Sequence, residues 1–314
     1  MTDAAERCSV LAGVAGEPLA GTASSGRRRW LLVEQPGPWG RDALVESGVD
    51  GRVARELQRT AKRLGVHVQL IRGRGGGARD GRRVCYLAST ERDAVWLERV
   101  ELDLGEPEQL LKLDLDALAA GRPTGAGTLV QVPLYLVCTH GRRDPCCALR
   151  GRPVLDAAAG VAGERVWETS HVGGHRFAGN LVCFPDGLYL GRLGRDEGAR
   201  AVELYDQGRI LLAHYRGRSS DHWAAQVADW WVRDRTGLDR VGDLTVSEVV
   251  EDAEQATVRL AAPDGRRWRV PVRRVPLGRA LPQSCGEAPE DPGVGRVVEA
   301  AVEAAVEAVS RRRS

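Results

Sequence analysis

One stretch near the start of this chain constrains its fold most, because an amphipathic helix pattern separates two short apolar runs. Residues 30–34 (Trp-Leu-Leu-Val-Glu) suit a buried strand, and residues 66–71 suit another. Between them, apolar side chains at positions 53, 57, 61 and 64 fall on one face of a helix over residues 51–64. A strand, a helix and a second strand in this order predict an α/β fold.

The same order of elements returns in the second half of the chain. The first unit continues with expected strands at 84–88 and 94–102 and a helix at 107–120. In the second half we expect strands at 129–137 and 166–168 around a helix at 147–160, then a hairpin at 179–193 and helices at 198–213 and 220–236. Two such units predict an internal structural duplication into two thioredoxin-like halves, without a sequence repeat.

Composition divides the chain further. Residues 121–127 are rich in Gly and Pro and form the expected linker between the halves, while alternating apolar and polar residues over 243–276 predict a small β-meander. The predicted parts are a flexible N-terminus (1–27), an N-terminal thioredoxin-like half (28–120), a second thioredoxin-like domain (128–240), a β-meander (241–281) and a linker with a C-terminal helix at 297–309 (282–314).

The overall composition excludes several classes of function. The 314 residues include 45 basic and 43 acidic side chains, so the charge of +2 gives no reason to expect a nucleic-acid partner. No apolar run approaches the ~18 residues of a membrane span, and the first residues lack the apolar core of a secretory signal. Seven cysteines are an odd number and too few for a disulfide scaffold, so we expect a cytoplasmic protein with reduced thiols. The oligomeric state is not indicated.

The chemically distinctive residues gather in two loops. Cys138 ends a predicted strand and is followed within ten residues by Cys146 and Cys147, and His171 and His175 come about two dozen residues later. Thiolates and imidazoles are ligands for zinc or an iron–sulfur cluster. Because adjacent cysteines rarely serve one site, the residues alone leave open which of the pair would bind. The cysteines Cys85 and Cys183 are typical small buried residues, and Cys8 and Cys285 lie in segments without predicted structure, so they receive no role.

The histidine pair favours a loop over a helix. Two histidines four residues apart on a helix are typical of zinc proteases, but that motif requires a Glu after the first His, where Val172 stands. Gly173 and Gly174 also disfavour a helix, and they allow the backbone to approach an inorganic group closely.

Polar side chains near these loops are expected to surround the ligands. His140 and Asp144 can hydrogen-bond to them, and Arg143 can offset thiolate charge. Arg142, Arg143 and Arg176 could also steer an acidic redox partner protein.

Both loops resemble the sucrase/ferredoxin-like family, over roughly residues 28–235. The residues that carry the resemblance are Cys138-Thr-His-Gly-Arg-Arg-Asp-Pro-Cys-Cys147, Ser170-His-Val-Gly-Gly-His-Arg-Phe-Ala-Gly-Asn180 and Pro36-Gly-Pro-Trp-Gly40. The resemblance implies that residues 128–240 form a thioredoxin-like ferredoxin domain with a [2Fe–2S] cluster. Carried over by position, it implies the ligands Cys138, His171, His175 and Cys147, nine residues after Cys138, with Cys146 as the alternative.

From this ligand set we expect a soluble electron carrier rather than an enzyme. Two neutral imidazoles in place of two thiolates raise a cluster's potential, and the imidazole can couple the electron to a proton. The donor and acceptor are not indicated. The alternatives are a structural zinc protein with the same ligands and a thiol–disulfide oxidoreductase, which would lack a Cys-x-x-Cys motif. The chain has no paired-carboxylate loop for glycoside hydrolysis.

Overall fold

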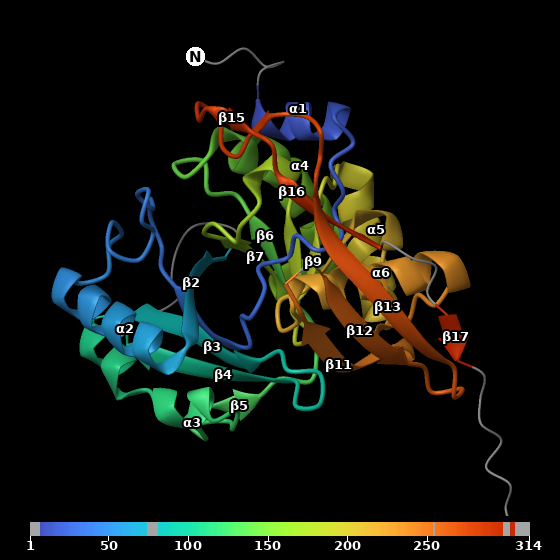
Figure 1. The fold of residues 1–314 in the computed structure, drawn as a ribbon. Helices are drawn as coiled ribbons and strands as arrows, with labels where there is room; N and C mark the ends of the chain where they lie inside the picture. Colours follow the sequence, from blue (N-terminus) through green and yellow to red (C-terminus); the bar gives the residue numbers. More distant parts are fainter. Residues whose placement is uncertain (1–6, 74–80, 104, 254, 298–301, 305–314) are drawn as a thin grey trace, which may run out of the picture.

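A ten-stranded sheet runs through the protein and is covered by several helices, with a smaller sheet beside it (Figure 1). The computed structural model describes residues 7–73, 81–103, 105–253, 255–297 and 302–304. The expected α/β class is confirmed as a mixed α/β fold with one large curled sheet. Within the described residues, no helix has both the length and the apolar composition needed to cross a bilayer.

The elements follow one another in this order. The α-helices are α1 (Cys8–Val14), α2 (Gly51–Leu64), α3 (Leu115–Ala119), α4 (Pro145–Ala162), α5 (Arg195–Asp206) and α6 (Trp223–Thr236). The strands of the large sheet are β1 (Arg29–Glu34), β2 (Val66–Arg72), β3 (Arg82–Ser89), β4 (Trp96–Asp103), β5 (Thr128–Leu129), β6 (Leu134–Cys138), β7 (Val166–Thr169), β8 (Leu181–Phe184), β9 (Leu188–Leu190) and β10 (Tyr215–Arg218). The remaining strands are β11 (Thr245–Glu251), β12 (Ala256–Ala261), β13 (Arg267–Pro276), β14 (Leu281–Pro282), β15 (Pro289–Glu290), β16 (Gly293–Val297) and β17 (Val302–Ala304).

The order of strands repeats within the large sheet. Strands β1 and β2 are parallel around α2, and β3 and β4 lie antiparallel on the other side of β1. Likewise β6 and β7 are parallel around α4, and β8 and β9 lie antiparallel beyond β6. Strands β2 and β7 pair antiparallel, so the two units share one continuous sheet. The division of the chain into separate domains stays a prediction.

Local chemistry explains why α2 matches its prediction. The Asp50 side chain accepts hydrogen bonds from the backbone N–H groups of Arg52 and Val53, which caps the start of the helix. Gly65 ends it in the left-handed conformation, with φ of 70°. The expected apolar face, including Val53 and Leu57, is buried in the core of the first unit.

Three predicted elements are shorter than expected. The helix at 107–120 is a 3₁₀-helix (Pro107–Lys112) followed by α3, because Asp114 starts a new helix by capping Ala117. The strand at 129–137 is divided between β5, which pairs with β4, and β6, which pairs with β7 and β8. The helix at 198–213 ends at Asp206, just before Gly208 at a φ of 71°.

The N-terminal segment is packed over residues 7–27, which corrects the expectation of a flexible start for that range; residues 1–6 lie outside the described part of the chain. Ser24 donates from Oγ to the carbonyl of Val172 at 2.7 Å, and the buried Glu17 pairs with Arg176 at 2.8 Å. These contacts are long-range in sequence, and the Gly- and Ser-rich composition of the segment gives no sign of them.

The C-terminal part forms an antiparallel sheet of β11, β12, β13 and β16, against which α6 packs. The predicted meander is thereby confirmed. The predicted C-terminal helix at 297–309 is wrong for its described residues, because Val297 ends β16 and residues 302–304 form β17, both paired with β13. The other residues of that helix lie outside the described part of the chain.

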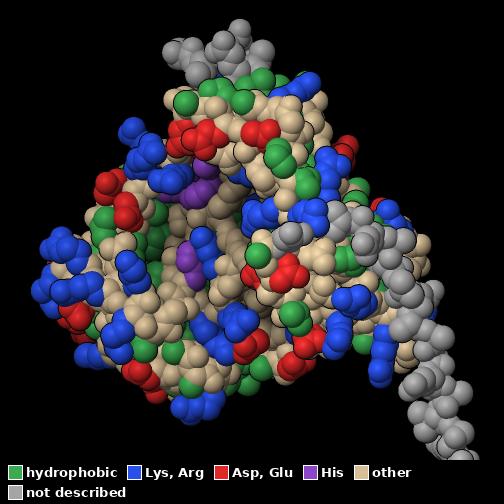
Figure 2. All heavy atoms as spheres, in the orientation of Figure 1, with side chains coloured by type: hydrophobic (Ala, Val, Ile, Leu, Met, Phe, Trp, Pro, Cys, Tyr) green, Lys and Arg blue, Asp and Glu red, His purple; other side chains and the backbone are tan. Residues whose placement is uncertain are grey.

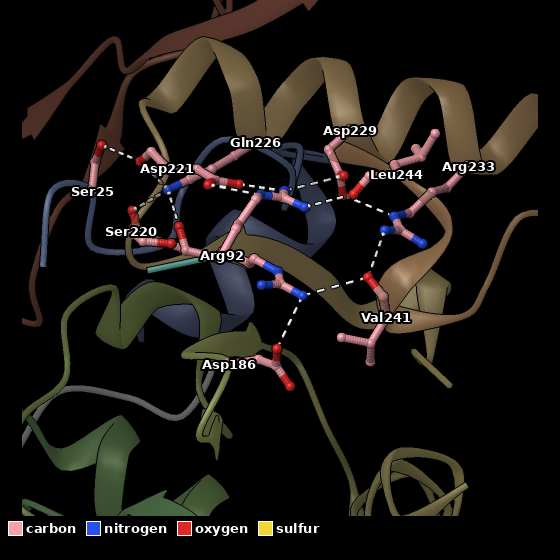
Figure 3. Close-up of polar contacts among 12 residues, drawn as sticks. Ser25, Arg92, Asp186, Ser220, Asp221, Gln226, Asp229, Arg233, Val241 and Leu244 are labelled. Atoms are coloured by element: carbon pink, nitrogen blue, oxygen red, sulfur yellow. Dashed lines mark hydrogen bonds and ion pairs between the residues drawn. The ribbon is translucent and has the colours of Figure 1, made fainter. Parts of the chain in front are cut away.

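A buried network of charges joins the first unit to α6 (Figure 3). Arg92, between β3 and β4, donates to both carboxylate oxygens of Asp221 at 3.1 and 2.6 Å. It also lies 3.3 Å from Asp229 of α6, which pairs with Arg233 at 2.9 Å. These side chains hold α6 and the C-terminal sheet against the large sheet.

Candidate metal centre

The two chemically distinctive loops meet at one edge of the large sheet. Cys138 is the last residue of β6, and its partner in the parallel strand β7 is Thr169, two residues before His171. Because the carboxyl ends of parallel strands lie at the same edge, the loops that follow them are neighbours. Parallel pairing therefore accounts for the convergence of Cys138 and His171.

Helix α4 brings a second thiol to this point. Asp144 caps the helix by accepting a hydrogen bond from the N–H of Cys146 at 2.8 Å. One turn later, a Cβ at Gly151 would overlap the carbonyl oxygen of Cys138, so only glycine lets α4 lie this close to β6. Cys147, in the first turn of α4, consequently faces Cys138.

Three donor groups come together here. The thiols of Cys138 and Cys147 and a ring nitrogen of His171 all lie within 4.8 Å of one another. Nδ1 of His171 is 3.7 Å from Sγ of Cys147. Both thiols are buried and the histidine is half-buried. The structure thus brings together Cys138, Cys147 and His171 and places Cys146 in another group.

His175 lies beside this group, next to the edge of the His171 ring that carries Nε2, whereas Nδ1 of His171 is near Cys147. Its Nδ1 is 3.4 Å from Nε2 of His171. Its own Nε2 is buried, and no hydrogen bond of good geometry reaches it from the described residues. A buried nitrogen without a partner is costly unless something else binds it. His175 is therefore placed to be a fourth donor.

The histidine loop has the conformation expected from its glycines. Gly173 and Gly174 have φ values of 97° and 71°, and His175 opens a single 3₁₀ turn that ends at Phe177. The predicted loop is confirmed over these residues. A Cβ at Gly174 would also overlap the guanidinium of Arg216.

Arg216 is a supporting residue that the sequence analysis missed. It is fully buried and donates from Nη1 to the carbonyl of Gly173 at 3.2 Å and to Oδ1 of Asn180 at 2.8 Å. Burial lowers the pKa of its guanidinium to about 10. Its position in β10, far from both motifs in sequence, left no signal by which it could have been found.

His140 connects the site to the Pro36–Gly40 loop of the first unit. Its Nδ1 accepts a hydrogen bond from the backbone N–H of His171 at 3.2 Å, and its Nε2 lies 2.7 Å from the carbonyl oxygen of Gly40. These two contacts require Nδ1 as acceptor and Nε2 as donor, so the ring is neutral. Burial lowers the pKa of His140, in agreement with that state.

The pKa shifts of the two thiols favour one thiolate, at Cys138, and one protonated thiol, at Cys147. A hydrogen bond from Cys147, together with His171, lowers the pKa of Cys138 well below its usual value. The pKa of Cys147 is raised well above its usual value by its hydrogen bond to Cys138, by burial and by repulsion from the Cys138 thiolate. Burial and the neighbouring His171 lower the pKa of His175. A cation between the thiols would allow both to ionise.

A cavity of about 790 Å³ opens beside the centre, between the first unit and the histidine loop. Figure 2 shows this hollow with histidine side chains in its wall and lysine and arginine side chains around it. Its lining includes His140 and His171 and the basic residues Arg27, Arg41, Lys62 and Arg143. Of the arginines expected to steer a partner, Arg142 and Arg143 are exposed, but Arg176 is engaged by Glu17.

Comparison with known proteins supports the resemblance of the two loops. A family model described as sucrase/ferredoxin-like matches residues 19–217. The chain belongs to the sucrase/ferredoxin-like family. No solved structure matches it significantly.

Similar curated proteins all carry one name, Altered inheritance of mitochondria protein 32. The protein from Eremothecium gossypii is 32% identical over 114 residues, which are 32% of this chain and 36% of that protein. The protein from Meyerozyma guilliermondii is 33% identical over 95 residues, or 27% of this chain and 34% of that protein. This chain therefore matches about a third of the length of these relatives.

These relatives correct the expected function. From the two loops we expected a soluble [2Fe–2S] electron carrier, with a structural zinc protein or a thiol–disulfide oxidoreductase as alternatives. The curated relatives are named for the inheritance of mitochondria and not as electron carriers. What the structure offers is a set of Cys and His groups that could hold a metal.

Proposed function

We propose that this protein binds a metal centre through Cys138, Cys147 and His171, with His175 as the fourth ligand. The observation that carries the proposal is the convergence of two buried thiols and an imidazole nitrogen within 4.8 Å. Thiolates and imidazoles in this combination select zinc or iron–sulfur clusters over the hard cations magnesium and calcium.

The cofactor that we propose is a [2Fe–2S] cluster. A cluster of two irons has two ligand positions on each iron, so it needs four protein donors. Three converge here, and the fourth is supported by the buried Nε2 of His175, which no hydrogen bond of good geometry reaches among the described residues. When bound, such a cluster would supply a one-electron redox couple at the edge of the cavity.

The residues around the donors would hold them in place. His140 fixes the backbone of His171 through its Nδ1, and Arg216 fixes the carbonyl of Gly173. The buried positive charge of Arg216 also favours a negatively charged thiolate centre nearby. Residues that position ligands in this way strongly affect metal affinity.

We further propose that the two units of the sheet are thioredoxin-like. In both, two parallel strands enclose a helix and two antiparallel strands follow on the far side of the first strand, as in β2-β1-β3-β4 and β7-β6-β8-β9. A solved structure of either unit would test this fold. The cytoplasmic location stays a prediction, which cell fractionation would test.

Matched cysteine variants test the metal centre. The full chain would be purified without oxygen, as wild type and as Cys147→Ala, Cys146→Ala and Cys183→Ala, and its metal content measured by mass spectrometry. We expect Cys147→Ala to lose the metal of this centre. We expect Cys183→Ala to retain it, because Cys183 is a buried thiol that belongs to no group of possible metal ligands among the described residues. Loss of iron in Cys146→Ala with retention of iron in Cys147→Ala would overturn the ligand set.

A further inference from the structure

A second group of sulfur donors surrounds the start of α4, separate from the first centre. Sγ of Cys146 lies 3.6 Å from Sγ of Cys8 in α1 and 3.4 Å from Sγ of Cys285, in the segment between β14 and β15. Cys285 and Cys8 are 3.6 Å apart, which closes a triangle of three sulfurs. The carboxylate of Asp144 lies 3.8 and 3.9 Å from Sγ of Cys8.

These distances match the edges of a zinc tetrahedron. With zinc–sulfur bonds of ~2.3 Å, two sulfurs at the tetrahedral angle are ~3.8 Å apart, and a sulfur and a carboxylate oxygen are ~3.5 Å apart. The observed separations differ from these by only a few tenths of an ångström. A disulfide would require a sulfur–sulfur distance of about 2.05 Å and could use only two of the three sulfurs.

The charge around Asp144 also points to a cation. Asp144 is 1% exposed and accepts hydrogen bonds from the N–H groups of Cys146 and Cys285 and from the hydroxyl of Ser284. Among the described residues, no lysine, arginine or histidine forms an ion pair with it. A buried carboxylate beside three thiols is costly unless a positive charge joins them. Three hydrogen bonds leave the carboxylate a free lone-pair position for that ion.

We propose that Cys8, Cys146 and Cys285 bind a structural zinc ion, with Asp144 as the fourth ligand. Three sulfurs and one oxygen, all buried except the half-buried Cys285, suit zinc better than calcium or magnesium, which take six or more oxygen ligands. This site is independent of the [2Fe–2S] proposal, since it shares no ligand with the first centre. The adjacent residues Cys146 and Cys147 serve one site each.

The zinc ion would join three segments that are remote in sequence. Cys8 and Cys285 are 277 residues apart, and each is more than 130 residues from Cys146. In Figure 1, α1 and β15 lie together over α4. Helix α1 contacts both β14 and the 3₁₀ turn that begins at His175. The ion would therefore hold the two terminal segments over the histidine loop of the first centre.

Metal analysis of the full chain tests this site. The protein would be purified without oxygen or chelators, as wild type, Cys285→Ala and Cys85→Ala, and its zinc and iron measured by mass spectrometry. Cys285 is half-buried, so its loss is the mildest change among the three ligands, and Cys85 is a buried thiol outside both groups. We expect Cys285→Ala to lose one equivalent of zinc without loss of iron, and Cys85→Ala to lose neither.

Several results would overturn the proposal. A Cys285→Ala variant that contains as much zinc as wild type would overturn it. A reduced wild-type protein that takes up no zinc at this site would also overturn it. A disulfide among the three cysteines in protein purified without oxygen would also contradict it. X-ray absorption at the zinc edge should show three sulfurs at ~2.3 Å and one oxygen. A site of two sulfurs and two nitrogens would instead place the zinc at the histidine loop.

Discussion

Replacement of Asp229 by asparagine should strongly destabilise the protein. Asp229 is fully buried in α6 and lies between Arg233 at 2.9 Å and Arg92 at 3.3 Å (Figure 3). Burial alone would raise the pKa of this carboxyl, but Arg233 and Arg92 lower it to about 2 from a usual value of 3.8. The variant Asp229→Asn keeps the shape of the side chain and removes the charge that pairs with Arg233 and Arg92, which leaves Arg92 with Asp221 as its carboxylate partner.

The size of the effect follows from the pKa and from the burial of the pair. A lowering of about 1.8 pH units corresponds to about 2.5 kcal/mol of stability at pH 7. Removal of one partner from a buried ion pair costs about 3–5 kcal/mol. We therefore expect the variant to lose about 3 kcal/mol. Because the folded pKa is depressed, this contribution is complete above pH 4 and disappears as the pH falls toward 2.

Urea denaturation followed by tryptophan fluorescence measures the loss, since Trp230 and Trp231 lie in the same helix. The matched control is Asp234→Asn, because Asp234 is on α6 and its side chain is 54% exposed. We expect the control to remain within about 0.5 kcal/mol of wild type. An Asp229→Asn variant as stable as this control at pH 7 would refute the reasoning.

Three further predictions concern the cavity and the centre. Burial and Arg27 lower the pKa of His67 to about 3, so unfolding makes this side chain take up a proton as the pH falls from 7 to 5. By urea denaturation at each pH, His67→Gln should therefore lose about 1–2 kcal/mol less stability over this range than wild type does. Gly174→Ala should lower both the melting temperature and the metal content, because the added Cβ would overlap Arg216. The control Gly208→Ala should lower only the melting temperature, because Gly208 has the same φ of 71° but open space around it. Equal metal loss in both variants would contradict the overlap argument. His140→Ala should weaken metal retention about 10- to 100-fold in a chelator competition, and unchanged retention would show that the hydrogen bond to His171 has no such role.

The sequence predicted those parts of the molecule that depend on neighbouring residues. The bounds of α2 follow from Asp50 and Gly65, which cap its two ends within the helix itself. Cys138 and His171 follow strands that were each predicted from the sequence, and the parallel pairing of those strands brings the two residues together. The proposal of Cys147 rather than Cys146 rests on the position of α4 on β6, which Gly151 permits.

The parts that the sequence could not predict depend on contacts between remote segments. Cys8 and Cys285 had no predicted structure around them, and only the packing of both terminal segments on α4 places them beside Cys146. Arg216 supports the histidine loop from a strand outside both motifs. No local pattern of residues reports such contacts.

The most direct test of the central claim is the amount of iron and acid-labile sulfide bound by the full chain purified without oxygen. A [2Fe–2S] cluster held by Cys138, Cys147, His171 and His175 predicts two irons and two sulfides per chain, both lost in Cys147→Ala and both retained in Cys183→Ala. A wild-type protein that contains neither iron nor sulfide, and gains neither on reconstitution, would contradict it.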